Sequence, residues 1–518
     1  MFNLTLDELD NAVEAIKHHT YSVYFPSPLE WTDVLANWSA IRAHLASFDL
    51  DIYQPRPPLR TFAPKSRINL RPVALLHPYD LIIYTGLTLI ARDDIEAARV
   101  PRGDKRLFSH RATPSLTTRL YESSTEAHAW LRATQRDRAS RSRCRIVAVT
   151  DIADFFPRIY QHRLENIIRS VARSPRVTDV ARVLVKKLLL AFSRGDSYGI
   201  PIGPLASSVL SEAVLIDVDA AMLDAGYDFV RWMDDYTFFC RSESEAQQAL
   251  FALGEWLYEH HGLTLQPSKT KILRKASFLE GISRTYQERL QDRSASLQET
   301  WSTVWSLYGD ESAVELSPEQ LREIEALNLR EMLDEAIGGE AGVDFQLAEF
   351  LIGTVARSPS IPTDNKKALV DLVLTRLVDL FPIVDSIARF IDNLDDLSAA
   401  ECKKIGRELL KPLKLKGTPE YVAMWLLSVF ASSDRWNHAA TIRDLYDHAN
   451  SEVVKRYAAL ALSASGTRQH VLSTRPGFDG GSPLLRTAIL RAWHRLGSDE
   501  RTHWKRVSVI SDPLEKVI

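Results

Sequence analysis

Hydrophobic and polar positions follow two different patterns along the chain, and the change falls near residue 290. Before that point, short β-branched and aromatic runs with polar or acidic breaks predict strands at 145–156, 227–240 and 263–274. Apolar residues at helical spacing predict helices between the strands, at 161–173, 177–194 and 205–225. This mixture predicts an α+β fold with an antiparallel sheet.

After residue 290 the strand pattern stops and amphipathic segments follow one another. They lie at 317–337, 365–381, 383–394, 399–411, 419–432, 438–449, 452–464 and 483–496. Short connections between such helices predict an α-solenoid of the HEAT or armadillo kind. No clean repeated motif accompanies the spacing, so an irregular helical bundle is the alternative. We expect three domains, at 1–145, 146–290 and 291–518, the last all-α and HEAT-like.

Composition indicates an ordinary globular chain of more than one domain. Its 518 residues are 45% hydrophobic and 25% charged. The longest apolar run, Leu81 to Ala91, is shorter than the roughly 20 residues of a membrane-spanning helix. The acidic N-terminus lacks the basic flank of a signal peptide. Cys144, Cys240 and Cys402 form no CxxC pair. We expect a cytoplasmic protein without a membrane partner.

The charge is distributed unevenly along the chain. The whole chain has 64 Lys and Arg against 67 Asp and Glu, but residues 51–145 have 18 against 9, a local charge of +9. The densest part is 132–145, RATQRDRASRSRCR. A basic zone beside acidic residues suits the binding of a polyanion. A solvated Arg/Ser-rich linker is the alternative for 132–145 alone.

Acidic residues at the ends of two predicted strands are the candidate chemistry. Asp151 and Asp154 follow one strand, and Asp234–Asp235 lies between two apolar runs that we expect to form an antiparallel hairpin. Carboxylates buried beside each other are unfavourable unless a cation compensates them. Adding a nucleotide to a 3′-hydroxyl uses two divalent ions on carboxylate oxygens, which Mg²⁺ prefers. The sequence therefore predicts a site for two Mg²⁺ ions.

A series of short motifs, in order over residues 50–285, resembles the reverse transcriptases. Asp151-Ile-Ala-Asp-Phe-Phe156 resembles motif A, Gly199-Ile-Pro-Ile-Gly-Pro204 motif B, Trp232-Met-Asp-Asp235 motif C, Ser268-Lys-Thr-Lys271 motif D and Phe278-Leu-Glu-Gly281 motif E. Upstream, Lys65-Ser-Arg67, Arg71 and Phe108-Ser-His-Arg111 are similar to the finger segments. The resemblance implies fingers within 1–145 and a palm at 146–290.

The resemblance also implies roles for the acidic residues. Asp151 and Asp234 would be metal ligands, Asp235 the third acid, and the backbone carbonyl of Ile152 a further ligand. Lys269 would protonate the pyrophosphate leaving group, with Lys271 an equally good candidate.

Further residues would contact the incoming dNTP. Phe156 would block a ribose 2′-hydroxyl; a core aromatic is the alternative. Pro201 and Gly203 would form a tight turn beside the nucleotide. Lys65 and Arg71 would grip the triphosphate; as finger residues they could equally be solvated charges.

One departure from the wider family narrows the resemblance. Ile202 stands where template-directed enzymes have Gln after the motif-B proline. This form, together with the helical C-terminus, resembles the bacterial abortive-infection (Abi) reverse transcriptases of the AbiK-like class. That class implies antiphage defence, untemplated synthesis of single-stranded DNA, priming from a tyrosine and assembly as a homo-oligomer. Tyr21, Tyr24 and Tyr53 are the priming candidates, and the phage-derived trigger is unknown.

Two other hypotheses fit parts of the sequence. A template-directed enzyme like those of retrons or group II introns would keep the motifs, although no RNA-binding thumb or maturase segment is recognisable after Gly281. A catalytically silent scaffold would use only the helical array. It would have no need to keep the acids, Phe156 and Lys269 together.

Overall fold

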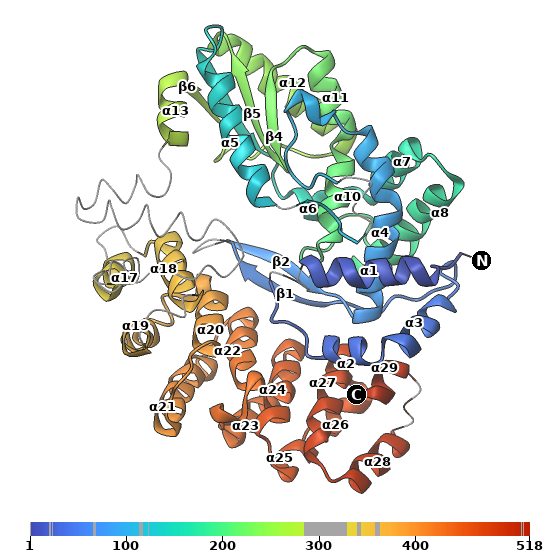
Figure 1. Cartoon of the computed structure of the whole chain (residues 1–518), viewed down its shortest axis with the longest axis vertical. Helices are drawn as coiled ribbons and strands as arrows, with labels where there is room; N and C mark the ends of the chain where they lie inside the picture. The colour runs from blue at the N-terminus through green and yellow to red at the C-terminus, as the bar shows by residue number, and fades with distance from the viewer. Residues whose placement is uncertain are drawn as a thin grey trace. The chain divides into compact units, whose positions relative to one another are not determined.

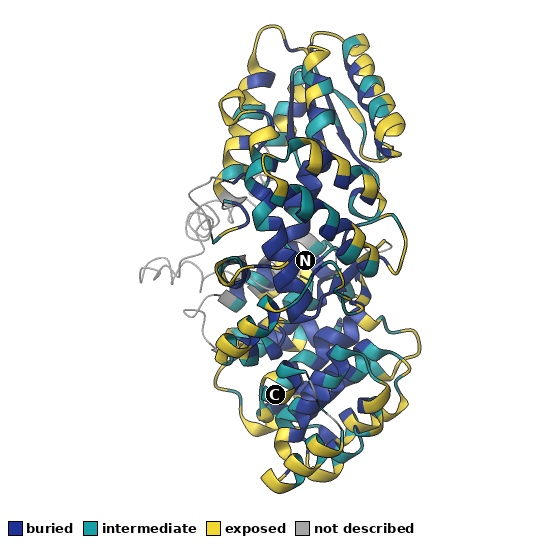
Figure 2. Ribbon diagram, turned by 90° about the vertical axis from the view of Figure 1, so that its right-hand side faces the viewer, coloured by how far each residue is buried: buried dark blue, intermediate teal, exposed yellow. Residues whose placement is uncertain are grey.

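The computed structural model describes residues 2–19, 22, 24–65, 69–112, 118–122, 124–283, 329–338, 343–357, 363–508, 510 and 512–518. Tertiary contacts group the chain into two compact units (Figure 1). The first consists of Met1–Tyr21, Arg42–Pro57 and Tyr79–Ala313, and the second of Ser22–Ile41, Pro58–Pro78 and Val314–Ile518. Core positions in each unit are buried (Figure 2). Within the described residues, no helix combines the length and apolar character needed to cross a bilayer.

The described elements up to residue 283 mix helices with six strands. The helices are α1 (Leu6–His19), α2 (Glu30–Ala36), α3 (Trp38–Ala46), α4 (Pro78–Ala98), η1 (Arg102–Asp104), α5 (Ser124–Ser140), α6 (Phe155–Arg158), α7 (Gln161–Val171), α8 (Pro175–Val183), the π-helical η2 (Leu184–Leu189), α9 (Leu190–Phe192), α10 (Ala206–Val214), α11 (Ile216–Asp224), α12 (Glu243–His261) and α13 (Lys275–Ser283). The strands are β1 (Leu59–Pro64), β2 (Leu70–Leu75), β3 (Ile146–Asp151), β4 (Phe229–Trp232), β5 (Asp235–Cys240) and β6 (Lys271–Arg274). The helices predicted at 161–173, 177–194 and 205–225 are confirmed, and α8, η2 and α9 together make the second of them.

An antiparallel sheet in the order β4-β5-β3-β6 forms the centre of the first unit. Side chains alternate between the two faces of a strand, so Val147, Val149 and Asp151 of β3 share one face. On that face α5 and α13 contribute Leu131 and Phe278 to a common apolar cluster with the strands. Helix α12 packs against β3 and β5.

The basic stretch at 132–145 forms the C-terminal half of α5 and the turn after it. Arg138, Arg141 and Arg143 all form ion pairs with Asp228, the last at 3.1 Å. These three arginines are therefore held by a structural acid, which favours a packed segment over the solvated linker.

The second unit combines helices with one β-hairpin. Strands β1 and β2 pair antiparallel, and β1 packs against α22 and α24. The described helices after residue 328 are α17 (Leu329–Gly338), α18 (Phe345–Arg357), α19 (Thr363–Thr375), η4 (Phe381–Ile383), α20 (Val384–Asp392), α21 (Ala399–Leu410), η5 (Pro412–Lys414), α22 (Glu420–Ser432), η6 (Asp434–Trp436), α23 (Ala439–His448), α24 (Glu452–Ser465), α25 (Arg468–Leu472), α26 (Pro476–Gly480), α27 (Pro483–Ala492), η7 (Trp493–Arg495), α28 (Ser498–Val507) and α29 (Pro513–Val517).

One series of helices packs in pairs: α18 on α20, α20 on α22, α22 on α24 and α24 on α27. The predicted helices from 365 onward are confirmed, and the first part of the segment at 317–337 lies outside the described residues. A HEAT-like repeat stays a prediction.

The two units are not consecutive stretches of the chain. The domains at 1–145, 146–290 and 291–518 stay a prediction. Residues 22–41 and 58–78 belong to the second unit because their tertiary contacts lie mainly within it. Glu30 of α2 is fully buried and forms a two-pronged ion pair with Arg456 of α24, at 2.6 and 2.9 Å.

Candidate active site

The β4–β5 hairpin carries the acidic doublet at its turn, as the sequence predicts. Trp232 pairs with Asp235 across the hairpin, and Met233 and Asp234 connect the strands. Met233 adopts a left-handed conformation, with φ at +50°. Asp235 also pairs with Asp151 on β3, so the sheet register brings the motif-A acid opposite the doublet.

Three carboxylates meet at this end of the sheet. Oxygen atoms of Asp151, Asp234 and Asp235 all lie within 4.8 Å of one another, and in the described residues no other such cluster of three potential metal ligands occurs. The backbone N–H of Ile152 donates to the carbonyl of Asp234 at 3.2 Å, which ties the hairpin turn to the end of β3. Asp151 is buried, Asp234 half-buried and Asp235 exposed.

The electrostatics of the three acids favour a bound cation. Burial first, and then the charges of Asp151 and Asp235, raise the pKa of Asp234 to about 7. Lys269 forms an ion pair with Asp151. Burial opposes the charge of Lys269, but Asp151 and the two neighbouring acids outweigh it and raise the pKa of Lys269. Three converging hard oxygen ligands fit Mg²⁺.

A buried network that the sequence reasoning missed holds the hairpin turn. Arg231 of β4 is fully buried and binds both carboxylate oxygens of Asp219, at 2.9 and 2.6 Å, and Glu212 at 2.9 Å. Its guanidinium also donates to the carbonyl of Met233 at 2.7 Å. Ser109 accepts from the N–H of Met233 at 2.8 Å and donates to Glu212. The sequence contained a signal for this network, an arginine inside the apolar run Phe229-Val-Arg-Trp232. An arginine that is buried in a strand needs acidic partners elsewhere in the fold.

A cavity of about 550 Å³ opens beside the acids. It is lined by Asp151, Asp235, Ser268, Lys269, Lys271, Trp232 and, from α5, His128, Leu131 and Gln135, among others. The His128 ring stacks on Trp232 with centroids 3.6 Å apart. Burial and then Arg132 lower the pKa of His128, so this ring is uncharged at neutral pH. The cavity thus combines carboxylates, two lysines and an aromatic pair, a combination that suits a nucleotide chain end.

Residues 101–290 match the family model described as "Reverse transcriptase (RNA-dependent DNA polymerase)". No curated protein sequence matches this chain. Two similar solved structures are telomerase from Candida albicans in complex with a fragment of telomeric RNA and apo telomerase from Candida tropicalis. The first is 11% identical, with a TM-score of 0.31, and the match covers 79% of this chain and 69% of the telomerase chain. The second is 10% identical, with a TM-score of 0.32, and the match covers 83% of this chain and 74% of the telomerase chain.

Residues 101–290 form a reverse-transcriptase domain. Such domains bind nucleotides and nucleic acid, use divalent metal ions and imply nucleotidyltransferase activity. All three clustered acids and Lys269 lie inside the matched residues.

Within the reverse-transcriptase domain, motifs A and B are joined through their backbones. The N–H of Ile200 donates to the carbonyl of Phe156 at 3.1 Å, and the N–H of Gly199 to Ile159 at 2.8 Å. Phe156 is half-buried, with its ring edge-on to Phe155 at 5.8 Å. Pro201 and Gly203 are buried in the same loop, and Gly203 has φ at +135°. The described lining of the cavity beside the acids does not include Phe156, Pro201 or Gly203.

The two residues predicted to grip the triphosphate lie in the hairpin of the second unit. Lys65 is exposed at the end of β1, and Arg71 on β2 donates to the hydroxyl of Tyr24. Their role stays a prediction.

The priming candidates have different surroundings. Tyr21 lies outside the described residues. Tyr53 donates its hydroxyl to Asp80 at 2.7 Å, and burial together with the Asp80 charge raises its pKa well above the usual range. Both hydroxyls accept from an arginine, Tyr53 from Arg56 at 3.0 Å and Tyr24 from Arg71. Which tyrosine primes stays a prediction.

Proposed function

We propose that this chain is a DNA polymerase of reverse-transcriptase type that acts in antiphage abortive infection in the cytoplasm. It uses dNTPs and two Mg²⁺ ions and makes single-stranded DNA without a template. The observation that supports the polymerase most directly is the convergence of Asp151, Asp234 and Asp235 within 4.8 Å, beside Lys269, in a reverse-transcriptase domain.

The residues of the site divide the work of nucleotide transfer. Asp151 and Asp234, with Asp235 and the carbonyl of Ile152, would hold the metal ions, which lower the pKa of the attacking hydroxyl and offset the charge of the triphosphate. Lys269 holds a proton beside Asp151 and gives it to the departing pyrophosphate. Lys65 and Arg71 attract the triphosphate. Phe156 excludes a ribose 2′-hydroxyl, so dNTPs are the substrate.

Untemplated synthesis is supported by the residue after the motif-B proline. Ile202 is aliphatic and half-buried, and it offers no polar group to a template base. Synthesis without added nucleic acid needs another hydroxyl to start from, and a tyrosine hydroxyl is the proposed source. Assembly as a homo-oligomer, a HEAT-like C-terminal domain and a phage-derived trigger complete the proposal by resemblance to the abortive-infection class.

The decisive experiment is dNTP incorporation by the purified full chain with Mg²⁺ and no nucleic acid. We expect DNA covalently attached to the protein. Mass mapping of the nucleotide-modified peptide then assigns the primer among Tyr21, Tyr24 and Tyr53. Product that forms only when a template-primer is added would reject the untemplated and protein-primed parts.

Template-directed synthesis is the second candidate, and the description of the matching family as an RNA-dependent DNA polymerase favours it. The same assay with added templates of different sequence separates the two. Product that copies each template supports this candidate, whereas product of constant composition excludes it.

A further inference from the structure

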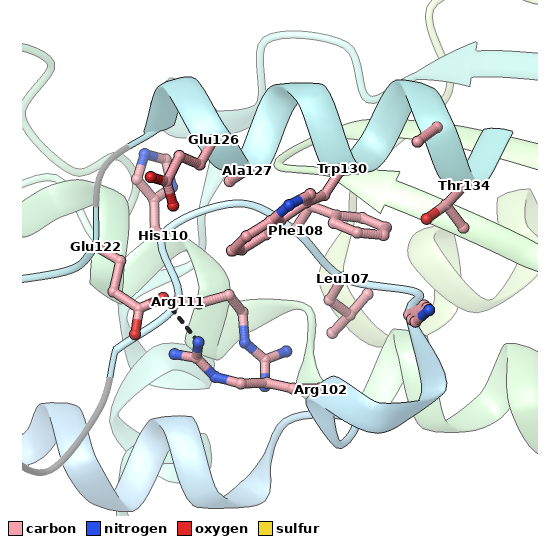
Figure 3. Close-up of a pocket in the computed structure, with 12 residues that line it drawn as sticks. Arg102, Leu107, Phe108, His110, Arg111, Glu122, Glu126, Ala127, Trp130 and Thr134 are labelled. Carbon is pink, nitrogen blue, oxygen red and sulfur yellow. Dashed lines mark hydrogen bonds and ion pairs between the residues drawn. The ribbon is translucent and has the colours of Figure 1, made fainter. Parts of the chain in front are cut away.

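A second cavity lies on the other side of α5 from the catalytic acids. Its volume is about 460 Å³, and it is formed by the segment from Arg102 to Arg111 together with α5 (Figure 3). Its lining residues are all different from those of the catalytic cavity. Neither the acids nor the motif-B loop contributes to it.

Helix periodicity explains why α5 separates two cavities. Residues three and four apart share one face of a helix. Glu126, Trp130 and Thr134 therefore face the second cavity together. His128, Leu131 and Gln135 occupy another face and line the catalytic cavity. One helix thus contributes side chains to both.

The second cavity has aromatic walls. Phe108 is almost fully buried, whereas Trp130 leaves 56% of its surface exposed. Figure 3 draws both rings beneath α5, among the residues that line the cavity. A large exposed aromatic ring beside a cavity is a surface on which a nucleobase can stack.

Two charged side chains of the cavity have no hydrogen bond or ion pair within the described residues. They are Lys105, after η1, and Glu126, on α5. The arginines nearby are engaged, because Arg102 pairs with Glu122 at 2.7 Å and Arg111 with Glu96 at 2.8 Å. A lysine attracts a phosphate, and a carboxylate accepts the N–H donors that every nucleobase carries. The volume falls in the range of small-ligand sites, roughly 300–1,000 Å³.

We propose that this cavity binds one nucleotide, through its base and its phosphate, at a site separate from the polymerase centre. The base stacks on Trp130 and donates to Glu126, and Lys105 contacts the phosphate. The ligand is either a free nucleotide or one unit of a DNA strand. This binding goes beyond the proposed function and needs no catalysis.

The test measures binding to the full-length Asp234→Asn variant in EDTA by equilibrium dialysis. Loss of the Asp234 carboxylate and the absence of metal silence the catalytic centre, so the result does not depend on polymerisation. One arm uses labelled dGMP and the other a labelled, 5′-phosphorylated deoxythymidine decamer. Trp130→Ala is expected to weaken binding about tenfold or more, on the scale of a lost stacking contact. Lys105→Gln, at an exposed position, is expected to weaken binding and reduce its dependence on salt.

The matched control is Tyr258→Ala on α12, which removes another exposed ring (69% exposed) of the same unit and should leave binding unchanged. Binding of dGMP with this pattern of variants identifies a free-nucleotide site. Binding of the decamer alone with the same pattern identifies a strand-binding site, and both results support the proposal. Absence of binding in both arms overturns it, as does equal binding by the Trp130→Ala and Tyr258→Ala variants. Polymerase activity of the unmodified chain is measured separately and tests the proposed function alone.

Discussion

At the scale of single residues, the candidate site is defined by acids that are unfavourable neighbours in the absence of a cation. The raised pKa of Asp234 reports this strain, since burial and two nearby carboxylates disfavour its charge. A divalent ion reverses that balance and makes the same geometry a binding site. Asp151 and Asp234 therefore differ from Asp154, the second acid of motif A, which is not part of the cluster.

Asp154 provides a matched control for the metal ligands. It lies three residues after Asp151, its side chain is 65% exposed, and its φ of +47° is a conformation that Asn adopts readily. We expect Asp234→Asn to lower dNTP incorporation at least about a hundredfold, the scale on which a lost charge-stabilising group acts. Asp154→Asn should retain near-normal incorporation. Equal losses in the two variants would show that the clustered carboxylates have no special role.

Substitutions of the two motif-D lysines are expected to have different effects on catalysis. Lys269 is held against Asp151, whereas Lys271 lines the same cavity without that contact. We expect Lys269→Gln to reduce the rate of a single incorporation by roughly 10²-fold, the lower range for a lost general acid, and Lys271→Gln to have a small effect. Rapid-quench measurement of one turnover checks both. A larger loss for Lys271→Gln would transfer the proposed acid to that residue.

At the scale of elements, the hairpin and the helices followed from local patterns, but the strand predicted at 263–274 was too long. Only Lys271–Arg274 forms β6, because the Pro267-Ser268 segment turns instead of extending. That turn, closed by the N–H of Lys269 on the carbonyl of Gln266 at 3.1 Å, is what places Lys269 beside Asp151. Local sequence patterns also could not predict the Arg231 network, because its partners Glu212 and Asp219 come from other elements.

The contact between motifs A and B depends on a glycine. Gly199 has φ at +86°, and a Cβ there would lie 3.1 Å from the carbonyl oxygen of Pro157, one residue after Phe156. Gly226 has φ at +78° and open space around it. We expect alanine at either position to lower the free energy of unfolding by roughly 1–2 kcal/mol. Only Gly199→Ala should also displace Phe156 and lower the preference for dNTPs over rNTPs, by about tenfold.

Competition between dNTP and rNTP incorporation in the two glycine variants checks this prediction. An unchanged preference in Gly199→Ala, with stability lowered as expected, would separate Phe156 from sugar selection.

At the scale of the whole molecule, the chain interleaves two compact units, and the segments 22–41 and 58–78 are grouped with residues far along the chain. The pattern of 22–41 and 58–78 resembles that of its neighbours, so nothing local indicates where these segments pack. The ion pair that joins the segment 22–41 to α24 links Glu30 and Arg456, which are 426 positions apart and both fully buried. Thr487 adds a hydrogen bond to Glu30 at 2.7 Å. Long-range burial of this kind is decided by the assembled core.

This ion pair predicts how the second unit responds to mutation and pH. Removing one partner of a buried pair leaves the other charge uncompensated, so Glu30→Gln should lower the free energy of unfolding by about 3–5 kcal/mol. Burial alone would raise the pKa of Glu30, but Arg456 and the hydrogen bonds outweigh it and lower the pKa below 4.5. The stabilisation by Glu30 is therefore complete above about pH 4.5, the pKa in the unfolded chain, and is lost as the pH falls towards the folded pKa.

Hydrogen exchange of peptides from α22, α24 and α27, measured at pH 7 and again near pH 4, locates the effect in this unit. The control is Asp371→Asn, which breaks the exposed pair with Lys404 (64% and 62% exposed) and should change little. We expect faster exchange in Glu30→Gln at pH 7, with a smaller difference from the unmodified protein near pH 4. A difference that grew as the pH fell would mean that Glu30 is protonated in the folded unit and that its charge does not hold the N-terminal segment in place.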